Sequence, residues 1–321
     1  MNVDQQSESG KLYPFLGYQK NSLLRKVRTL ADPATGSEQA IIKPPFLYQK
    51  PFDICKKTDE GLTLFWDDHN GFAREYRKQI EEHIRSYGLK IRLMTNNDTP
   101  GVLEFLSRRY PPHIASEISP FDLYRFRNFG HGILLEDKMG KIHGTIFEEL
   151  YGTKEKTSYT MRLAVSEEYK GKKLGFHVMI FSSLNAMEQG ARVKRGLIEF
   201  YNHRSLHINL NNVGWICDGF EPHISGLGAF FRIALPLDPR GLTTNVVDID
   251  KLRNFIETRI PEKDYQLIAV EDYETICQMY ETTDFKVVAF LQPGIVTNGA
   301  SFFAMPCERL QMINTDSGWL R

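Results

Sequence analysis

The hydrophobic and polar positions of this chain change period most clearly between residues 159 and 175. Met161, Leu163 and Val165 are apolar at every second position, which predicts a half-buried strand with these side chains on one face. The polar and charged residues that follow should end the strand. From Gly175 onward, apolar residues recur mostly at spacings of three and four, which predicts a helix packed on a sheet. The pattern therefore predicts a strand, a turn and a helix in direct succession.

The turn between this strand and this helix is basic. It contains Lys170, Lys172 and Lys173 around Gly171. The first N–H groups of a helix have no partner inside the helix, and its dipole is positive at that end. Such a turn is a site for phosphate or pyrophosphate, and the lysines add cations beside it. The alternative interpretation is a solvated basic turn, because runs of charge usually face water.

The run from Lys170 to Gly175 (KGKKLG) resembles the acyl-CoA loop of the GNAT acyltransferase superfamily. That loop has the pattern Arg/Gln-x-x-Gly-x-Gly/Ala between the fourth strand and the third helix of the fold. Here Lys170 replaces the Arg or Gln, and Lys173 stands where a Gly is expected. The flanking segments also follow the family's order, from roughly Lys90 to Leu237, which is somewhat under half of the chain.

The resemblance implies an α/β (α+β) fold with a GNAT-like mixed central sheet and helices on both faces. Periodicity and turn residues predict the individual elements. The predicted strands are residues 90–95, 133–136, 142–150, 161–165, 196–200 and 229–235. The predicted helices begin near residue 99, span 113–126 with a break or kink at Pro120, begin again at Gly175, and span 202–212.

Three parts follow along the chain: residues 1–88, 89–240 and 241–321. The first is an N-terminal arm and helical extension, irregular up to about residue 60, with a strand at 62–66. In it Phe72, Tyr76, Ile80 and Ile84 form a helical stripe that should end at Gly88. The second is the GNAT-like domain. The third is a small α+β appendage, with helices near 252–256 and 273–280 and strands at 266–270 and 285–291.

Composition excludes several classes of protein. Forty basic residues balance forty acidic ones, so no overall field favours nucleic acid or a membrane surface. No run approaches the ~20 apolar residues of a membrane span, and the polar N-terminus lacks a signal-peptide core, which makes the cytoplasm the expected location. The four cysteines form no C-x-x-C pair, so neither a disulfide framework nor a zinc ribbon is indicated.

The resemblance implies a reaction in which an amine of a small molecule or peptide attacks a thioester, with acyl-CoA or acetyl-CoA as co-substrate. In the family the pantetheine arm pairs with the fourth strand, which makes Leu163 and Val165 candidate donor contacts, although their side chains also fill the sheet. Asn202 matches an Asn often found after the fifth strand. The predicted phosphate contacts are Lys170, Gly171, Lys172, Lys173 and Gly175.

Four residues are candidates to handle protons: Glu148, Tyr159, Glu199 and His203. Glu148 and its neighbour Glu149 alternate along a strand, so they should lie on opposite faces of the sheet. The alternatives are a solvent-facing charge for either glutamate and a structural or surface role for His203.

Many relatives carry a Tyr shortly before a Gly-Phe pair, where it protonates the leaving thiolate. This chain has Asn-Leu-Asn-Asn at 209–212 before Gly214 and Trp215, so that acid is absent. His203 and His207 are spaced like metal ligands, but no H-E-x-x-H register or third ligand accompanies them, and no metal is predicted.

The leading hypothesis is an N-acyltransferase that uses acyl-CoA. The altered loop and the absent Tyr leave two alternatives, an acyl-carrier-protein-dependent N-acyl amino acid synthase and a catalytically silent thioester-binding protein.

Overall fold

The computed structural model describes residues 40–43, 47–50, 69–116, 118–151, 156–224, 228–237, 244–306 and 311–313. The chain divides into two compact units. We call residues 50–196 and 235–244 the signature unit, because they include the predicted phosphate turn. We call residues 1–49, 197–234 and 245–321 the aromatic unit. Each unit is described by itself.

The signature unit is built on a sheet with the strand order β7-β6-β5-β4-β3. Neighbouring strands from β3 to β6 are antiparallel, whereas β6 and β7 are parallel. The strands are β3 (Leu89–Leu93), β4 (Gly130–Asp137), β5 (Ile142–Tyr151), β6 (Lys156–Val165) and β7 (Ala191–Glu199), of which β7 continues into the aromatic unit after Gly196. This arrangement confirms the predicted mixed sheet.

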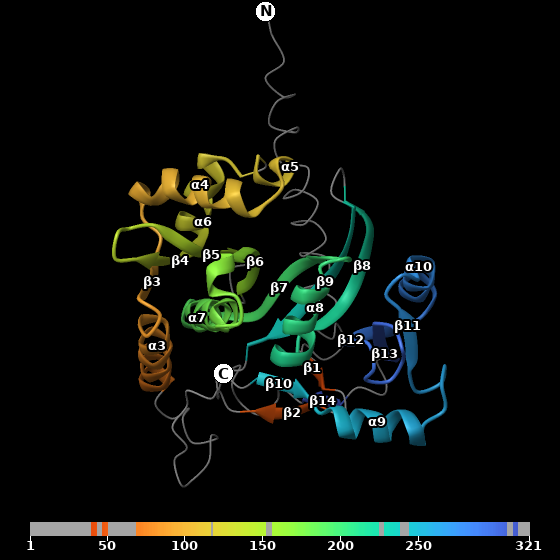
Figure 1. The fold of residues 1–321 in the computed structure, drawn as a ribbon. Coiled ribbons are helices and arrows are strands. Elements are labelled where there is room, and N and C mark those ends of the chain that lie inside the picture. The colour runs from red at the N-terminus through yellow and green to blue at the C-terminus, as the bar shows by residue number, and fades with distance from the viewer. Residues whose placement is uncertain are drawn as a thin grey trace, which may run out of the picture. The chain divides into compact units, whose positions relative to one another are not determined.

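Helices cover both faces of this sheet. In Figure 1, α4 and α6 lie on one side of β4 and β5, and α7 lies on the other. The helices are α3 (His69–Arg85), α4 (Thr99–Arg109), α5 (Pro112–Ala115), α6 (Pro120–Phe129) and α7 (Leu174–Glu188), with 3-10 turns η2 (Asn96–Asp98) and η3 (Glu167–Tyr169). The first face buries Val102, Phe105, Leu106, Leu123, Phe126 and Phe147 in one core cluster.

The predicted helix at 113–126 is instead two helices, α5 and α6. Pro120 is the first residue of α6, where its missing N–H costs nothing. Ser119 accepts a hydrogen bond from the backbone N–H of Asp122, and the Asp122 carboxylate accepts one from the backbone of Ser119. This capping box ends the preceding segment and starts the new helix.

The predicted helical stripe before Gly88 is confirmed at its described positions. Ile80 and Ile84 on α3 are fully buried. Gly88 has a φ of +75°, a conformation that glycine adopts at low cost after a helix. The turn between β4 and β5 is held by the Asp137 carboxylate, which accepts hydrogen bonds from the N–H groups of Met139 and Lys141.

The aromatic unit has an antiparallel sheet with the order β11-β13-β12-β8-β9. The Phe200 ring contacts four other rings of this unit, those of Phe220, Phe231, Tyr273 and Phe302, at centroid distances of 5.6 or 5.7 Å. The strands are β8 (Ile216–Ile224), β9 (Gly228–Pro236), β11 (Gln266–Ala269), β12 (Phe285–Leu291) and β13 (Ser301–Pro306). The helices are α8 (His203–Leu206), a π-helix η4 (His207–Val213), α9 (Ile249–Thr258) and α10 (Tyr273–Thr282).

The prediction of an irregular arm up to about residue 60 is wrong at two described segments. β1 (Ala40–Lys43) pairs with β14 (Gln311–Ile313), and β2 (Leu47–Lys50) pairs with β10 (Thr244–Val247). β1 contains two isoleucines and β2 a tyrosine, residue types that favour strands. The predicted strand at 62–66 lies outside the described residues. The division into three parts stays a prediction.

Candidate functional site

A β-bulge interrupts the signature strand β6. Its register against β5 shifts between the pairs Phe147–Met161 and Thr145–Ala164, so β6 has one extra residue there. Arg162 lies in this bulge with a φ of +55°, which is uncommon for a residue with a side chain. Strained backbone of this kind is often found at functional sites.

The bulge overturns the predicted alternation along β6. Ala164, rather than Leu163 or Val165, is buried in the same core cluster against which Met161 packs. An extra residue reverses the face of every side chain that follows it, and the sequence pattern carries no sign of that reversal. Leu163 and Val165 are half-buried. Their role as donor contacts stays a prediction.

Two side chains hold the carbonyl groups of the bulge. The Thr145 hydroxyl donates to the carbonyl of Arg162 at 3.1 Å, and the Tyr110 hydroxyl donates to the carbonyl of Leu163 at 3.3 Å. The Arg162 guanidinium lies over the Tyr110 ring, 5.5 Å from its centroid. Burial raises the pKa of Tyr110, so the phenol stays protonated and remains a donor.

The pairing of β6 with β7 covers only the first part of β6. The parallel ladder of β6 with β7 ends at the pair Thr160–Gly196. The last residues of β6, 161–165, therefore continue past the paired part of that edge. Backbone groups on such an edge can pair with an extended ligand as a further strand would.

The turn after β6 has the geometry of a phosphate loop. Ser166 donates its backbone N–H to the carbonyl of His143, and η3 follows. Gly171 and Lys173 have φ values of +80° and +57°, and Lys173 is the N-cap of α7. The Lys173 side chain makes no capping hydrogen bond to this helix.

Lys173, which stands where the family pattern has a glycine, has a backbone conformation that favours glycine. A left-handed conformation costs an L-residue about 1–2 kcal/mol, and glycine adopts it freely. This position therefore requires a positive φ, and it has room for a side chain. Lys173 is exposed, as are Lys170, Gly171 and Lys172.

Gly175 lies in the first turn of α7 and has no side chain there. A Cβ at this position would lie 3.8 Å from Cγ2 of Val165, an ordinary contact distance. The fold itself therefore does not require glycine here, although a ligand approaching the helix N-terminus would meet any larger side chain.

Charged pairs fix the turn to the neighbouring elements. The buried His143 imidazole lies between carboxylates, with Nε2 3.0 Å from Asp137 and Nδ1 2.7 Å from Glu168. The hydrogen bond from His143 lowers the pKa of Asp137. Arg109 at the end of α4 pairs with Glu167 at 2.9 Å. The turn is thus attached both to the β4–β5 hairpin and to α4.

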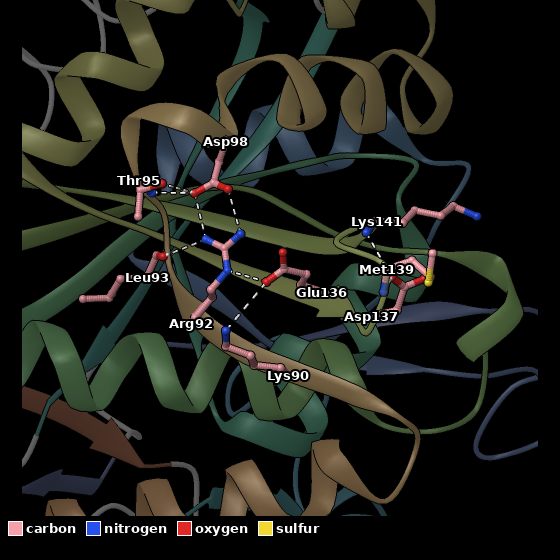
Figure 2. Close-up of polar contacts among 9 residues, drawn as sticks. All are labelled: Lys90, Arg92, Leu93, Thr95, Asp98, Glu136, Asp137, Met139 and Lys141. Carbon is pink, nitrogen blue, oxygen red and sulfur yellow. Dashed lines mark hydrogen bonds and ion pairs between the residues drawn. The ribbon is translucent and has the colours of Figure 1, made fainter.

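A second group of charges lies where α4 begins, and we call Arg92, Thr95, Asp98 and Glu136 the rim cluster. Figure 2 shows the Arg92 guanidinium between the two carboxylates. Arg92 donates to both oxygens of Asp98 at 2.7 Å and to Glu136 at 2.5 Å. The hydrogen bond from Arg92 lowers the pKa of Asp98 to about 2. The cluster joins β3 and β4 to the start of α4.

Two predicted proton-handling residues lie inside the signature unit. Glu148 is fully buried, with Oε1 2.5 Å from Nζ of Lys194. Tyr159 is buried too, and burial raises its pKa well above the usual range. Glu149 pairs with Arg125 of α6 at 2.6 Å, whereas Glu148 meets α7. The prediction that the two glutamates lie on opposite faces is confirmed.

The other predicted residues lie in the aromatic unit. Glu199 is exposed at the end of β7. The Asn202 side chain caps α8 by accepting the N–H of Ser205 at 3.1 Å. The His203 ring lies 5.2 Å from the ring of Phe290. The roles of these three residues stay predictions.

The asparagines in place of the family's Tyr contribute to the structure. Asn211 is buried and binds both backbone groups of Phe290, donating to its carbonyl at 2.6 Å and accepting its N–H at 2.9 Å. Asn209 donates to the carbonyl of Ser205 at 2.8 Å. A carboxamide cannot protonate a thiolate, so these two residues supply no general acid.

The sequence analysis missed the residues around Glu148. We call His131, Glu148, Ser158, Thr160, Ser182, Ser183 and Lys194 the buried network. Every one of them except Thr160 is buried. Two signals were present in the sequence: the polar pair Ser182-Ser183 in a helix that is otherwise largely apolar, and the alternation of Ser158 and Thr160 with larger residues on β6.

Within the described ranges, no group of three or more His, Cys, Asp and Glu residues could hold a metal ion. His207 Nδ1 accepts a hydrogen bond from Asn211 Nδ2 at 3.1 Å, and burial lowers the pKa of His207. Among the described helices, none has the length and apolar character needed to cross a membrane.

No family model matches the chain, and no curated protein matches it. As the resemblance predicted, solved structures that match part of the chain include GNAT-family acetyltransferases. One, from Staphylococcus aureus, is 15% identical, with 47% of this chain and 99% of the other covered and a TM-score of 0.36. A ribosomal-protein-S5-alanine acetyltransferase from Vibrio fischeri is 15% identical over 47% and 94%, with a TM-score of 0.38. The NatC complex, solved with Gag peptide and CoA, is 13% identical over 47% and 99%, with a TM-score of 0.39.

Proposed function

We propose that this protein is an N-acyltransferase that moves an acyl group from acyl-CoA to a primary amine of a small molecule or peptide. One observation carries the proposal. The bulged strand β6, whose last residues continue past its described pairing with β7, leads directly into a turn with exposed lysines at the start of α7. Such a segment can pair with the amide-containing arm of the donor and hold its phosphates at the same time.

The donor would bind along this segment in extended form. Its phosphates would lie at the first turn of α7, near Lys170, Lys172 and Lys173, while its arm would follow the last residues of β6. Backbone N–H groups at the bulge would then polarise the thioester carbonyl, which becomes negatively charged as the amine attacks. Tyr110 and Thr145 bind carbonyl groups of the bulge and keep its backbone in this conformation.

The reaction forms a bond from the amine nitrogen to the thioester carbon and breaks the carbon–sulfur bond. An ammonium substrate must lose one proton before it attacks and a second proton after the bond has formed. The base takes the first proton, and the leaving thiolate takes the second. No group beyond the amine, the thioester and the base is needed for this balance.

Two of the four residues predicted to handle protons, Glu148 and Tyr159, lie in the signature unit, and both are buried. A base must be within reach of the amine whose proton it takes, directly or through one water, so we propose neither of them as the base. Glu199 and His203 belong to the aromatic unit, and their roles stay predictions.

Thermal unfolding in the presence of donors tests the site directly. We expect free CoA, acetyl-CoA or a long-chain acyl-CoA to raise the midpoint, since a ligand that binds only the folded state stabilises it. Gly175→Leu should abolish that shift. The control is Gly299→Leu, because a Cβ at Gly299 would meet nothing within 4 Å, and one at Gly175 would meet only Cγ2 of Val165 at an ordinary contact distance. Retained affinity in Gly175→Leu would contradict the placement of the phosphates.

A second candidate function is thioester binding without turnover. The observation that favours it is that the carboxylates nearest the signature strand are already paired, Glu148 with Lys194 and Glu149 with Arg125. This protein would still be stabilised by CoA but would release no free thiol with any amine. An assay of thiol release over a panel of amines and amino acids separates the two functions.

An acyl-carrier-protein donor is the third alternative. It was suggested by Lys173, whose side chain could hinder a diphosphate. The left-handed backbone and the exposure of Lys173 account for the departure without a change of donor. Including an acyl-carrier protein in the unfolding series measures the preference between the two carriers.

A further inference from the structure

The buried network joins four strands of the signature unit to the middle of α7. Lys194 of β7 is fully buried, and its Nζ lies 2.5 Å from Glu148 of β5. The same Nζ donates to the hydroxyl groups of Ser182 and Ser183 and to the carbonyl of Met179, all on α7, at 3.1–3.3 Å. The lysine therefore contacts the helix at three points and the sheet at one.

The Glu148 carboxylate completes the connection. It accepts hydrogen bonds from Ser158, Thr160 and Ser182, with Thr160 at 2.9 Å. On the far side, His131 of β4 lies 3.2 Å from the Ser182 hydroxyl. Ser182 thus bonds to the carboxylate and also contacts the ammonium and the imidazole.

Stability alone is a weak explanation for such a network. Removing two charges from water costs several kcal/mol for each ion, and well-packed hydrophobic side chains of similar volume are often at least as stabilising. The ion pair adds geometric specificity. Its hydrogen bonds form only when α7 has one rotation about its axis and one position along the sheet. Apolar packing permits small slides that these bonds do not.

The position of the network relates it to the proposed site. Thr160 is the last residue of β6 in the ladder with β7, and the bulge at Arg162 begins two residues later. Ser182 and Ser183 lie on the helix whose first turn is the proposed phosphate site. The network therefore connects the strand that would hold the thioester to the helix that would hold the phosphates.

We infer that Lys194 and Glu148 are positioning residues, which set the distance and rotation between the α7 N-terminus and the β6 bulge. This inference rests on the proposed function. A donor bound at both places has a fixed length between its phosphates and its carbonyl, so a shift of α7 moves the carbonyl relative to the bulge. A misplacement of about 1 Å can cost about 10²-fold in rate.

The test separates positioning from stability by replacing both charges together. Glu148→Leu/Lys194→Met should fold, with an unfolding midpoint near that of the unmodified protein, since apolar residues of similar size replace the pair. We expect its kcat to fall by about ten- to a hundredfold while the KM for the donor changes much less. Wild-type kcat in a folded double variant would overturn the inference.

A matched control removes an ion pair elsewhere in the same sheet. Arg92→Met/Glu136→Leu takes two charges from the rim cluster, and its kcat should stay within about twofold of the unmodified protein because it leaves α7 and β6 untouched. An equal loss of kcat in this control would mean that any ion pair of the sheet matters, which also contradicts a specific role.

Amide hydrogen exchange gives a readout that needs no turnover. The double variant should exchange faster than the control at residues 161–165 and 174–177, because it lacks the hydrogen bonds of Glu148 and Lys194 that connect α7 to the sheet. If the protein binds CoA but never releases thiol, the proposed function fails, and exchange still decides the inference. Should the double variant not fold, Ser182→Ala takes its place, and unchanged exchange and kcat in that variant would overturn the inference.

Discussion

The buried network and the rim cluster use the same chemistry in two environments of one sheet. Each joins a basic side chain on one strand to a glutamate on another strand and extends to a helix. The side chains of Glu148 and Lys194 have no exposure at all, whereas those of Arg92, Asp98 and Glu136 are 20%, 11% and 16% exposed. The comparison shows how a partly exposed ion pair differs from a fully buried one in its effect on pKa values and stability.

The difference appears in the two cations. Burial lowers the pKa of Lys194, because loss of water disfavours the ammonium more than Glu148 stabilises it. The pKa of Arg92 is raised instead, chiefly by its hydrogen bonds to Asp98 and Glu136. Hydrogen-bond partners are the main influence on the pKa of Arg92, and desolvation is the main influence on the pKa of Lys194. The ion pairs of the rim cluster therefore stabilise the fold. The ion pair of the buried network costs desolvation energy, so its presence needs an explanation other than stability.

Breaking the buried pair should have the largest effect. Lys194→Met leaves the Glu148 carboxylate buried without a cation, which should lower the free energy of unfolding by about 3–5 kcal/mol. Chemical denaturation measures this loss. The double variant Glu148→Leu/Lys194→Met should recover most of it. A single variant as stable as the unmodified protein would show that water reaches the network.

The histidine of the buried network should make the protein sensitive to acid. Burial lowers the pKa of His131 from 6.5 to about 4, with Lys194 and Arg77 opposing its charge and Glu148 favouring it. The unfolded chain therefore binds this proton first, and stability that is complete above about pH 6.5 is lost as the pH falls to about 4, by about 3 kcal/mol.

His131→Gln removes that titration. The difference in unfolding free energy between the variant and the unmodified protein should change by this amount across the same window, as denaturation at several pH values would measure. Parallel curves for the two proteins would contradict the burial of His131.

The rim cluster should respond less and at lower pH. Arg92→Met should cost about 0.5–1 kcal/mol, because water and salt screen partly exposed pairs. The pKa of Asp98 is lowered to about 2 and that of Glu136 is lowered as well, so their stabilisation is present above about pH 4 and is lost as the pH falls toward 2. Raising the salt concentration should weaken the rim cluster and leave the buried network unchanged. Equal salt dependence of the two would remove the distinction.

The smallest effect concerns a cation outside both clusters. Lys173→Gly relieves a left-handed conformation that costs about 1–2 kcal/mol, and glycine loses about 0.5–1 kcal/mol of that gain through its more flexible unfolded state. The expected result is a stabilisation of about 0.5 kcal/mol. Lys172→Gly, one residue earlier and without a positive φ, is the control and should be slightly destabilising. Thermal unfolding without donor measures both.

The order of elements could be predicted because it depends on local patterns. The period of apolar residues in α7, the stripe on α3 and the proline in the first turn of α4 each mark their element within a few residues. The phosphate turn was found in the same way, since a strand, a basic turn and a helix start are adjacent in the chain.

The bulge and the buried network could not be predicted, because both depend on residues far apart in sequence. Met161, Leu163 and Val165 fit an unbroken strand equally well, and only the pairing with β5 shows the extra residue. Lys194 resembles a solvent-facing charge on a strand until Glu148 is placed beside it. For the same reason Glu148 looked like an accessible base, although the structure buries it.

The left-handed backbone at Lys173 bears on how such proteins are found. A pattern written in residue letters counts this lysine as a mismatch, because glycine is the usual occupant. Written in dihedral angles, the same position has the positive φ, +57°, that glycine adopts most easily. Chains that place a lysine or asparagine at this point of the loop would pass unnoticed in a search for the glycine, while a search by backbone conformation would gather them with this one.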